Sequence, residues 1–201
     1  MHNIHTTAGF VINSRPYGDA GNILNIFTRD LGLISVIAQG IRLEKSKLRY
    51  YTQEYSLGKY SFVRGKEYWR LTSANSIDNF ELNNIEDKKI HKLTHEIIAR
   101  VALLLRRFLQ GEEPQPELFD CVESFILYTQ SNFDLDIHHI SSLESLIVYR
   151  ILSLLGYIGN DIEIDITIKQ GPISISLLDL VTMKRKMINQ HINKALQESH
   201  L

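Results

Sequence analysis

The sequence is poor in the residue that cross-links small proteins. It contains a single cysteine, Cys121, among 201 residues. One cysteine excludes an internal disulfide and any zinc site built from several cysteines. Because disulfides are characteristic of oxidising compartments, this usage fits the reducing cytosol, and we expect a cytoplasmic protein.

Long hydrophobic runs are also missing. The longest uninterrupted aliphatic stretch covers residues 101–105, whereas a membrane-spanning helix needs about 20 mostly apolar residues. The first residues, MHNIHTT, lack the basic-then-apolar pattern of a secretory signal. We therefore expect neither a signal peptide nor a contact with membranes.

The sequence lacks the common catalytic motifs. His95-Glu96 is not followed by a histidine at position 99, and His91 and His95, one helical turn apart, have no evident third metal ligand. The glycine-containing segment 58–66 is followed by Glu67, where a P-loop requires serine or threonine. We predict a non-enzyme with no catalytic residues, no metal site and no cofactor.

Charge is unevenly distributed along a chain whose net charge is only −1. Residues 1–80 carry ten basic and six acidic side chains, and residues 81–201 carry twelve and seventeen. Between residues 40 and 70, eight basic side chains face only three acidic ones. This asymmetry predicts two domains, 1–80 and 81–201, of which the first has a polyanion as a candidate partner.

The first domain has the pattern of a small β-structure. Short apolar or alternating runs are separated by turn residues such as those of 16–21 and 64–67. A barrel of five short strands and this length is typically an OB-fold, whose face and loops bind single strands. Tyr60, Phe62 and Trp69 are predicted to lie in its core. The predicted strands are 9–15, 22–28, 33–38, 54–63 and 68–74.

The second domain has the pattern of a helical bundle. Apolar residues recur every three or four positions between 87 and 110, and further helices are predicted over 118–128, from a capping box at Ser141 and Glu144, and from Ser176 with Asp179. Isoleucines alternate with polar residues over 162–168, which predicts a β-hairpin near 161–176. The predicted fold class is α+β: an N-terminal five-stranded OB-fold β-barrel followed by an α-helical bundle with a small β-hairpin insertion.

A basic loop follows the predicted hairpin of residues 22–38. Cations delivered on a loop can neutralise phosphates, and aromatic rings beside them can stack on bases. A solvated basic loop on an ordinary β-domain is the alternative. Tyr50 and Tyr51 are the candidate stacking rings. The candidate phosphate contacts are Arg42, Lys45, Lys47 and Arg49, followed by Arg15, Arg64, Lys66 and Arg70.

Several of these segments resemble the N-terminal domain of the bacterial RecO family of DNA repair proteins. The resemblance is carried by residues 14–20 (SRPYGDA), 27–35 (FTRDLGLIS), 38–42 (AQGIR), 45–49 (KSKLR) and 68–74 (YWRLTSA). It is specific through about residue 75. Beyond that point it rests on the helical layout and on the LLGY motif at 154–157.

The resemblance implies an OB-fold followed by a helical domain, in a recombination mediator that works in the cytoplasm and associates with the nucleoid during repair. Such proteins bind single- and double-stranded DNA and anneal complementary strands. They also bind RecR and the C-terminal tail of the single-stranded DNA-binding protein, and with RecR they help to load the recombinase RecA. Many members carry a four-cysteine zinc module after the Leu-Gly-Tyr motif. This chain has no cysteines there, so we expect no zinc and a smaller structural element in its place.

Two other functions remain as alternatives. A non-enzymatic protein–protein adaptor, in which the basic loop is incidental, is consistent with the acidic second domain. A metal-dependent nuclease is disfavoured, because no cluster of carboxylates accompanies the basic region.

Overall fold

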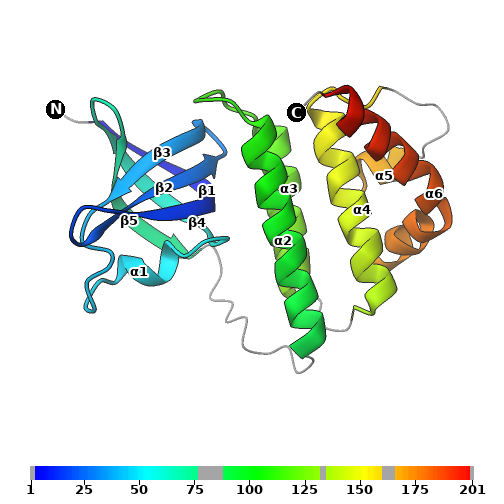
Figure 1. Cartoon of the computed structure of the whole chain (residues 1–201), viewed down its shortest axis with the longest axis horizontal. Coiled ribbons are helices and arrows are strands. Elements are labelled where there is room, and N and C mark those ends of the chain that lie inside the picture. Colours follow the sequence, from blue (N-terminus) through cyan, green and yellow to red (C-terminus); the bar gives the residue numbers. More distant parts are fainter. Residues whose placement is uncertain (1–2, 77–87, 132–134, 160–165, 200–201) are drawn as a thin grey trace. The chain divides into compact units, whose positions relative to one another are not determined.

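The computed structural model describes residues 3–76, 88–131, 135–159 and 166–199. In these ranges five strands, with one short helix between the third and the fourth, are followed by helices (Figure 1). In chain order the elements are β1 (Ile4–Tyr17), β2 (Gly21–Thr28), β3 (Gly32–Ala38), α1 (Leu48–Tyr51), β4 (Leu57–Arg64), β5 (Trp69–Ser76), α2 (Lys88–Phe108), α3 (Pro116–Ser131), α4 (Ile137–Leu154), α5 (Ile166–Gln170) and α6 (Ile175–Glu198).

The five strands close into a barrel in the order β1-β2-β3-β5-β4. Strand β1 is long enough to serve two neighbours: its first half pairs with β4, its second half pairs with β2, and the register shifts between Val11 and Asn13. Strands β3 and β5 pair in parallel over a short stretch. Closure leaves little unpaired strand edge. The predicted α+β class with an N-terminal five-stranded OB-fold barrel is confirmed.

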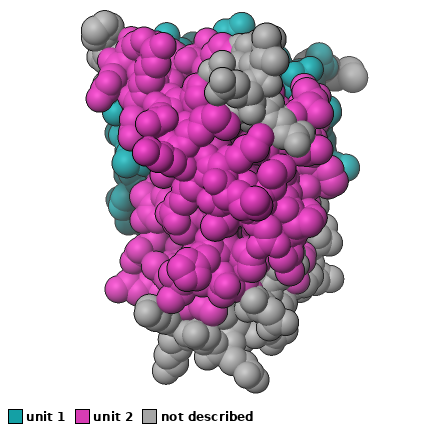
Figure 2. Space-filling model, turned by 90° about the vertical axis from the view of Figure 1, so that its right-hand side faces the viewer, with its two compact units in different colours: residues 1–80, 102–119 teal, residues 81–101, 120–201 magenta. Residues whose placement is uncertain are grey.

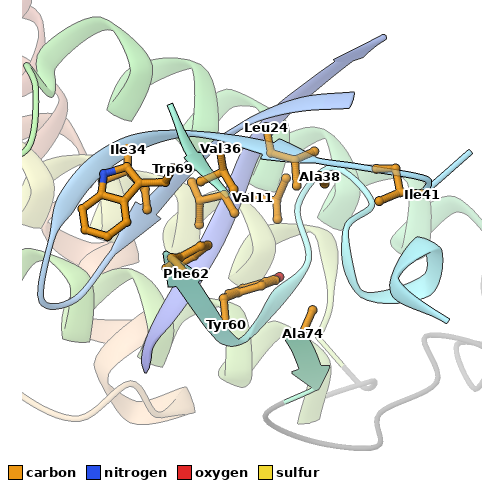
Figure 3. Packing of buried hydrophobic residues seen from close by; sticks show 11 residues of the cluster. Val11, Leu24, Ile34, Val36, Ala38, Ile41, Tyr60, Phe62, Trp69 and Ala74 are labelled. Carbon is orange, nitrogen blue, oxygen red and sulfur yellow. The ribbon is translucent and has the colours of Figure 1, made fainter. Parts of the chain in front are cut away.

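The barrel interior is filled by one apolar cluster (Figure 3). Strand β3 contributes Ile34, Val36 and Ala38, which alternate with less buried residues as the pleat requires. The Tyr60 hydroxyl donates to the Tyr51 carbonyl oxygen at 2.9 Å, and burial raises the pKa of Tyr60. The predicted core residues are buried as expected: Tyr60, Phe62 and Trp69.

The turn between β2 and β3 requires a glycine for two reasons. Gly32 has φ 71°, in the left-handed region, and a Cβ at this position would overlap the backbone of Glu113. The neighbouring Leu33 N–H donates to the Gly111 carbonyl oxygen at 3.1 Å. The α2–α3 connection therefore packs directly onto this end of the barrel.

Contacts divide the chain into two compact units, distinguished by colour in Figure 2. Unit 1 consists of residues 1–80 and 102–119, and unit 2 consists of residues 81–101 and 120–201. Unit 1 thus includes the end of α2 and the start of α3, whose Phe119 ring lies 5.5 Å from the Phe27 ring on β2. The domain boundary predicted at residue 80 stays a prediction.

Helix α4 is the most extensively buried helix of unit 2, and it packs against α6 and α5. It begins after Asp136, whose carboxylate accepts the backbone N–H of His139 at 2.7 Å. This hydrogen bond lowers the pKa of Asp136. The predicted start at Ser141 and Glu144 was wrong, because Asp136 caps the helix earlier. Glu144 instead pairs with Arg100 of α2 through two hydrogen bonds of 2.5 and 3.1 Å.

The start of α6 also differs from the prediction. Ser174 is the capping residue, and its hydroxyl accepts the Leu177 N–H at 3.2 Å. The predicted pair of Ser176 and Asp179 lies within the first turns of the helix. Serine at either position fits the helix-start preference, so composition alone did not separate them.

The predicted β-hairpin near 161–176 was wrong over the residues that are described, and its first part, 161–165, lies outside them. Ile166 and Ile168 belong to the short helix α5, where only Ile168 is buried, and Ile175 opens α6. Pro172 has no N–H to donate to a strand ladder. The isoleucines of the described residues from 166 onward therefore pair with no strand.

Arg150 of α4 provides the physical reason for this helical turn. Its guanidinium is buried and donates to the carbonyl oxygens of Ile168 at 2.8 Å, Thr167 at 3.2 Å and Gly171 at 2.6 Å. These carbonyls lie at the end of α5, where a helix leaves acceptors unpaired and a cation is favourable. Burial lowers the pKa of Arg150. One arginine thus attaches α5 to α4.

Candidate nucleic-acid interface

The basic loop between β3 and β4 leaves the barrel through Gly40, which has φ 68°. Three cations and one aromatic ring of this loop, together with one arginine toward the end of β1, form a set that we call the loop cluster. All are exposed members of unit 1. The loop cluster consists of Arg15, Lys45, Lys47, Arg49 and Tyr50.

Arg42 anchors this loop. Its backbone N–H donates to the Ala20 carbonyl oxygen at 3.0 Å. Its Nη2 donates to the carbonyl oxygens of Gly18 at 2.5 Å and Asp19 at 2.6 Å. These three acceptors belong to the turn between β1 and β2, so Arg42 holds the base of the loop against that turn. Arg42 therefore stabilises the loop, and its predicted contact with phosphate stays a prediction.

The other cations of the loop have no such task. Among the described residues, no ion pair or side-chain hydrogen bond engages Lys45, Lys47 or Arg49. The helical turn α1 places Arg49 beside Tyr50, and the Thr52 hydroxyl closes this turn on the Leu48 carbonyl oxygen at 2.8 Å. The loop thus presents a net positive charge to solvent on side chains without an ion pair, and such a charge attracts a polyanion.

The two candidate stacking rings have different environments. Tyr50 is 60% exposed, whereas Tyr51 is half-buried and packs against the barrel core. The two rings meet edge to face with centroids 5.2 Å apart. The exposed Tyr50 ring is accessible for stacking on a base, and the half-buried Tyr51 ring packs against it.

A second basic group, the turn cluster, comprises Arg64, Lys66 and Arg70 around the β4–β5 turn. Lys66 and Arg70 are exposed. Arg64 forms an ion pair with Glu112 of the α2–α3 connection, and its guanidinium lies 4.8 Å from the centroid of the Trp69 ring. The Trp69 Nε1–H also donates to Glu112, at 3.1 Å. Arg64 therefore links two parts of unit 1.

The strand register separates the two clusters. Val63, next to Arg64, pairs with Ile4 at the start of β1. Arg15 lies near the other end of the same strand, where it pairs with Ile23. The loop cluster and the turn cluster thus lie toward opposite ends of β1. The structure gathers the predicted site residues into two groups rather than one.

No group of three or more histidine, cysteine, aspartate or glutamate side chains among the described residues is placed to hold a metal ion. None of their helices has the length and hydropathy to cross a bilayer. Cys121 is largely enclosed, and burial raises the pKa of its thiol to about 11.

Sequence reasoning missed two acidic residues of unit 1. Glu112 neutralises Arg64, and the Glu54 carboxylate accepts the Ser14 N–H at 2.9 Å. Both contacts join residues at least 40 positions apart in the chain. A single sequence contains no signal for such a pairing, although Glu112 does follow the predicted helix stop at Gly111.

Comparison with known proteins matches residues 1–80, which contain the whole barrel, to the family described as "Recombination protein O N terminal". Three relatives are each named "DNA repair protein RecO". The one from Halalkalibacterium halodurans is 28% identical over 134 residues, covering 66% of this chain and 50% of the relative. That from Clostridium novyi is 26% identical over 163 residues, covering 80% and 59%.

The relative from Rubrobacter xylanophilus is 36% identical over 77 residues, which cover 38% of this chain and 31% of the relative. The chain thus spans about a third to three-fifths of the length of these curated relatives. Two of the three matches continue past the barrel into the helices. The N-terminal domain, residues 1–80, therefore belongs to the RecO family.

Proposed function

We propose that this chain acts in DNA repair as a non-enzymatic mediator. It binds single- and double-stranded DNA, anneals complementary strands, and with RecR helps to load the recombinase. The names of the relatives support the repair role. One observation carries the DNA-binding part: Lys45, Lys47 and Arg49 extend from an anchored loop and form no ion pair among the described residues.

Strand annealing needs no bond chemistry. Two polyanions must approach each other, which requires that their charge be neutralised, and their base edges must stay free to pair. Lysine and arginine contacts to phosphates supply the first requirement and carry no sequence information. An exposed ring such as Tyr50 adds stacking that tolerates any base.

A salt series tests this proposal. Labelled single-stranded DNA is titrated with the full chain and followed by fluorescence anisotropy at several salt concentrations. We expect affinity to fall steeply with salt, with a slope of about −0.7 for each phosphate neutralised. An annealing assay with complementary strands follows under the same conditions. Absence of binding at low salt would contradict the proposal.

Exposed apolar side chains on unit 2 favour a protein-binding role as a second candidate. Ile166 on α5 and Ile175 and Met183 on α6 are 64%, 54% and 84% exposed. Apolar helix faces bind partner peptides. RecR and the C-terminal tail of the single-stranded DNA-binding protein are the partners we propose. Titration of labelled tail peptide in the absence of DNA tests this role, and unchanged affinity in a Met183→Glu variant would contradict the assignment to α6.

A further inference from the structure

A cavity of about 460 Å³ lies in unit 1 beside the basic loop. Strands β1 and β2 contribute Ser14 and Asn22, the loop contributes Arg42, and α1 and the connection to β4 contribute Arg49, Gln53 and Glu54. Its volume falls within the range of about 300–1,000 Å³ that is usual for small-molecule sites. Its lining combines two guanidinium groups with one carboxylate, so it suits a ligand that has both an anionic part and N–H donors.

The carboxylate of this cavity is held in place. Glu54 Oε1 accepts the Ser14 N–H at 2.9 Å, and no contact among the described residues engages Oε2. The next residue, Tyr55, has φ 69°, a conformation that costs a side-chain-bearing residue energy. The Tyr55 N–H donates to the Val11 carbonyl oxygen at 2.8 Å, and the Val11 N–H donates to the Ser56 carbonyl oxygen at 2.9 Å. These two hydrogen bonds to the bulge of β1 hold the neighbouring Glu54 at the edge of the cavity.

The cations of the cavity retain capacity for a ligand. Arg42 is anchored by Nη2 alone. A guanidinium has five N–H donors, so the donors on Nε and Nη1 remain for an anion. Arg49 has no ion pair within the described part of the chain. An anchored arginine beside an arginine without an ion pair matches a phosphate group, which accepts several charge-assisted hydrogen bonds.

We propose that this cavity binds one unstacked nucleotide of single-stranded DNA and prefers guanine to thymine. Arg49 and Arg42 bind its phosphate, and Glu54 accepts hydrogen bonds from its base. Guanine presents two adjacent donors, N1–H and the N2 amino group, to a carboxylate. Thymine presents one N–H between two carbonyl oxygens, which a carboxylate repels. This inference rests on the proposed DNA-binding function and adds a base preference to it.

The test uses the isotope-labelled full chain and two-dimensional amide NMR. The protein is titrated separately with dGMP, dTMP and inorganic phosphate. We expect dGMP to shift the amide signals of Ser14 and Glu54 and to bind about tenfold more tightly than dTMP, within the range for a two-point contact to a base edge. Phosphate alone is expected to perturb only the signals around Arg42 and Arg49.

Two variants locate the preference. Glu54→Gln keeps an oxygen for the Ser14 N–H but loses the charge, so the preference for dGMP should disappear while phosphate binding persists. Glu44→Gln is the matched control, because Glu44 is an exposed carboxylate of the same loop and does not line the cavity. Equal binding of dGMP and dTMP by the unmodified chain, or an equal loss in both variants, would overturn the inference.

A DNA experiment separates this inference from the proposed function. A short deoxythymidine oligomer with one central guanine is compared with the same oligomer without it, by anisotropy. Tighter binding of the guanine oligomer supports the cavity. If both oligomers bind equally and in a salt-dependent way, the proposed guanine preference of the cavity is overturned, and the proposed DNA binding stands. Binding of neither oligomer overturns the proposed function, and with it a DNA strand as the occupant.

Discussion

The two basic groups of unit 1 have similar composition and different surroundings. In the turn cluster, Arg64 is neutralised by Glu112 and covers the Trp69 ring. In the loop cluster, Lys45 and Lys47 form no ion pair among the described residues. Basic side chains of the turn cluster thus stabilise the fold toward one end of β1. Basic side chains of the loop cluster, toward the other end, remain accessible to a ligand.

This contrast shows that a count of cations does not locate a binding site. A cation already paired with a carboxylate adds little attraction for a phosphate, because the pair must first be broken. Surface ion pairs themselves contribute about 0–1 kcal/mol to stability. We therefore propose that the loop cluster binds DNA and that Arg64 supports the fold.

Reversing the loop charges should have the largest effect. Lys45→Glu, Lys47→Glu and Arg49→Glu together replace three attractive contacts with repulsive ones, and we expect affinity for single-stranded DNA to fall by at least about a hundredfold. Thermal unfolding followed by circular dichroism should be unchanged, because these side chains are exposed. Unaltered affinity in the triple variant would remove the loop from the interface.

Gly32→Ala should damage the fold and leave the loop cluster intact. The alanine would need a left-handed backbone and would overlap the Glu113 backbone, so we expect a loss of about 3 kcal/mol in the free energy of unfolding. Gly40→Ala is the control, because Gly40 has a similar φ and its added Cβ would meet only the Leu43 side chain, at 3.5 Å. We expect a loss of about 1 kcal/mol there. Urea unfolding measures both, and equal losses would contradict the packing of the α2–α3 connection.

Removal of the exposed ring should weaken DNA binding without affecting the charge. Tyr50→Ala is expected to reduce affinity for single-stranded DNA about tenfold, since stacking contributes about 1–3 kcal/mol per base. Tyr50→Phe keeps the ring and should bind like the unmodified chain. Anisotropy at high salt, where phosphate contacts are weakened, gives the clearest comparison. Equal loss in both variants would mean that the hydroxyl matters and the ring does not stack.

Arg64→Ala should have the smallest effect on DNA affinity, less than about threefold. Its effect on stability should be about 1 kcal/mol, because the ion pair is partly exposed and the contact with Trp69 adds a modest amount. Glu112→Gln keeps an acceptor for the Trp69 Nε1–H and removes the charge. A double-mutant cycle between the two substitutions measures their coupling. A tenfold loss of DNA affinity in Arg64→Ala would place the turn cluster in the interface.

Local patterns in the sequence predicted the barrel well. Alternation of apolar residues identified the strands, and Tyr60, Phe62 and Trp69 lie in the core as expected. Helix α2 ends at Phe108, three residues before the predicted stop at Gly111, which has φ 68°. These features depend on neighbours within a few residues, which one sequence displays directly.

Features set by distant partners could not be predicted in this way. The isoleucines near residue 166 alternate like a strand, yet Arg150 binds the carbonyl oxygens of Thr167 and Ile168 and holds a helical turn. Glu112 and Glu54 have roles that depend on Arg64 and Ser14, far away in the chain. Glu112 determines that Arg64 is already paired, and composition does not reveal the position of such a carboxylate.

The most direct test of the assignment compares salt dependence in two alanine variants. Affinity for single-stranded DNA is measured across a salt series for Lys45→Ala, Lys47→Ala and Arg49→Ala combined, and for Lys66→Ala with Arg70→Ala. The loop variant should lose about 2 from the slope of log affinity against log salt, since each phosphate contact contributes about 0.7. The turn variant should keep nearly the full slope. A larger loss of slope in the turn variant would contradict the account.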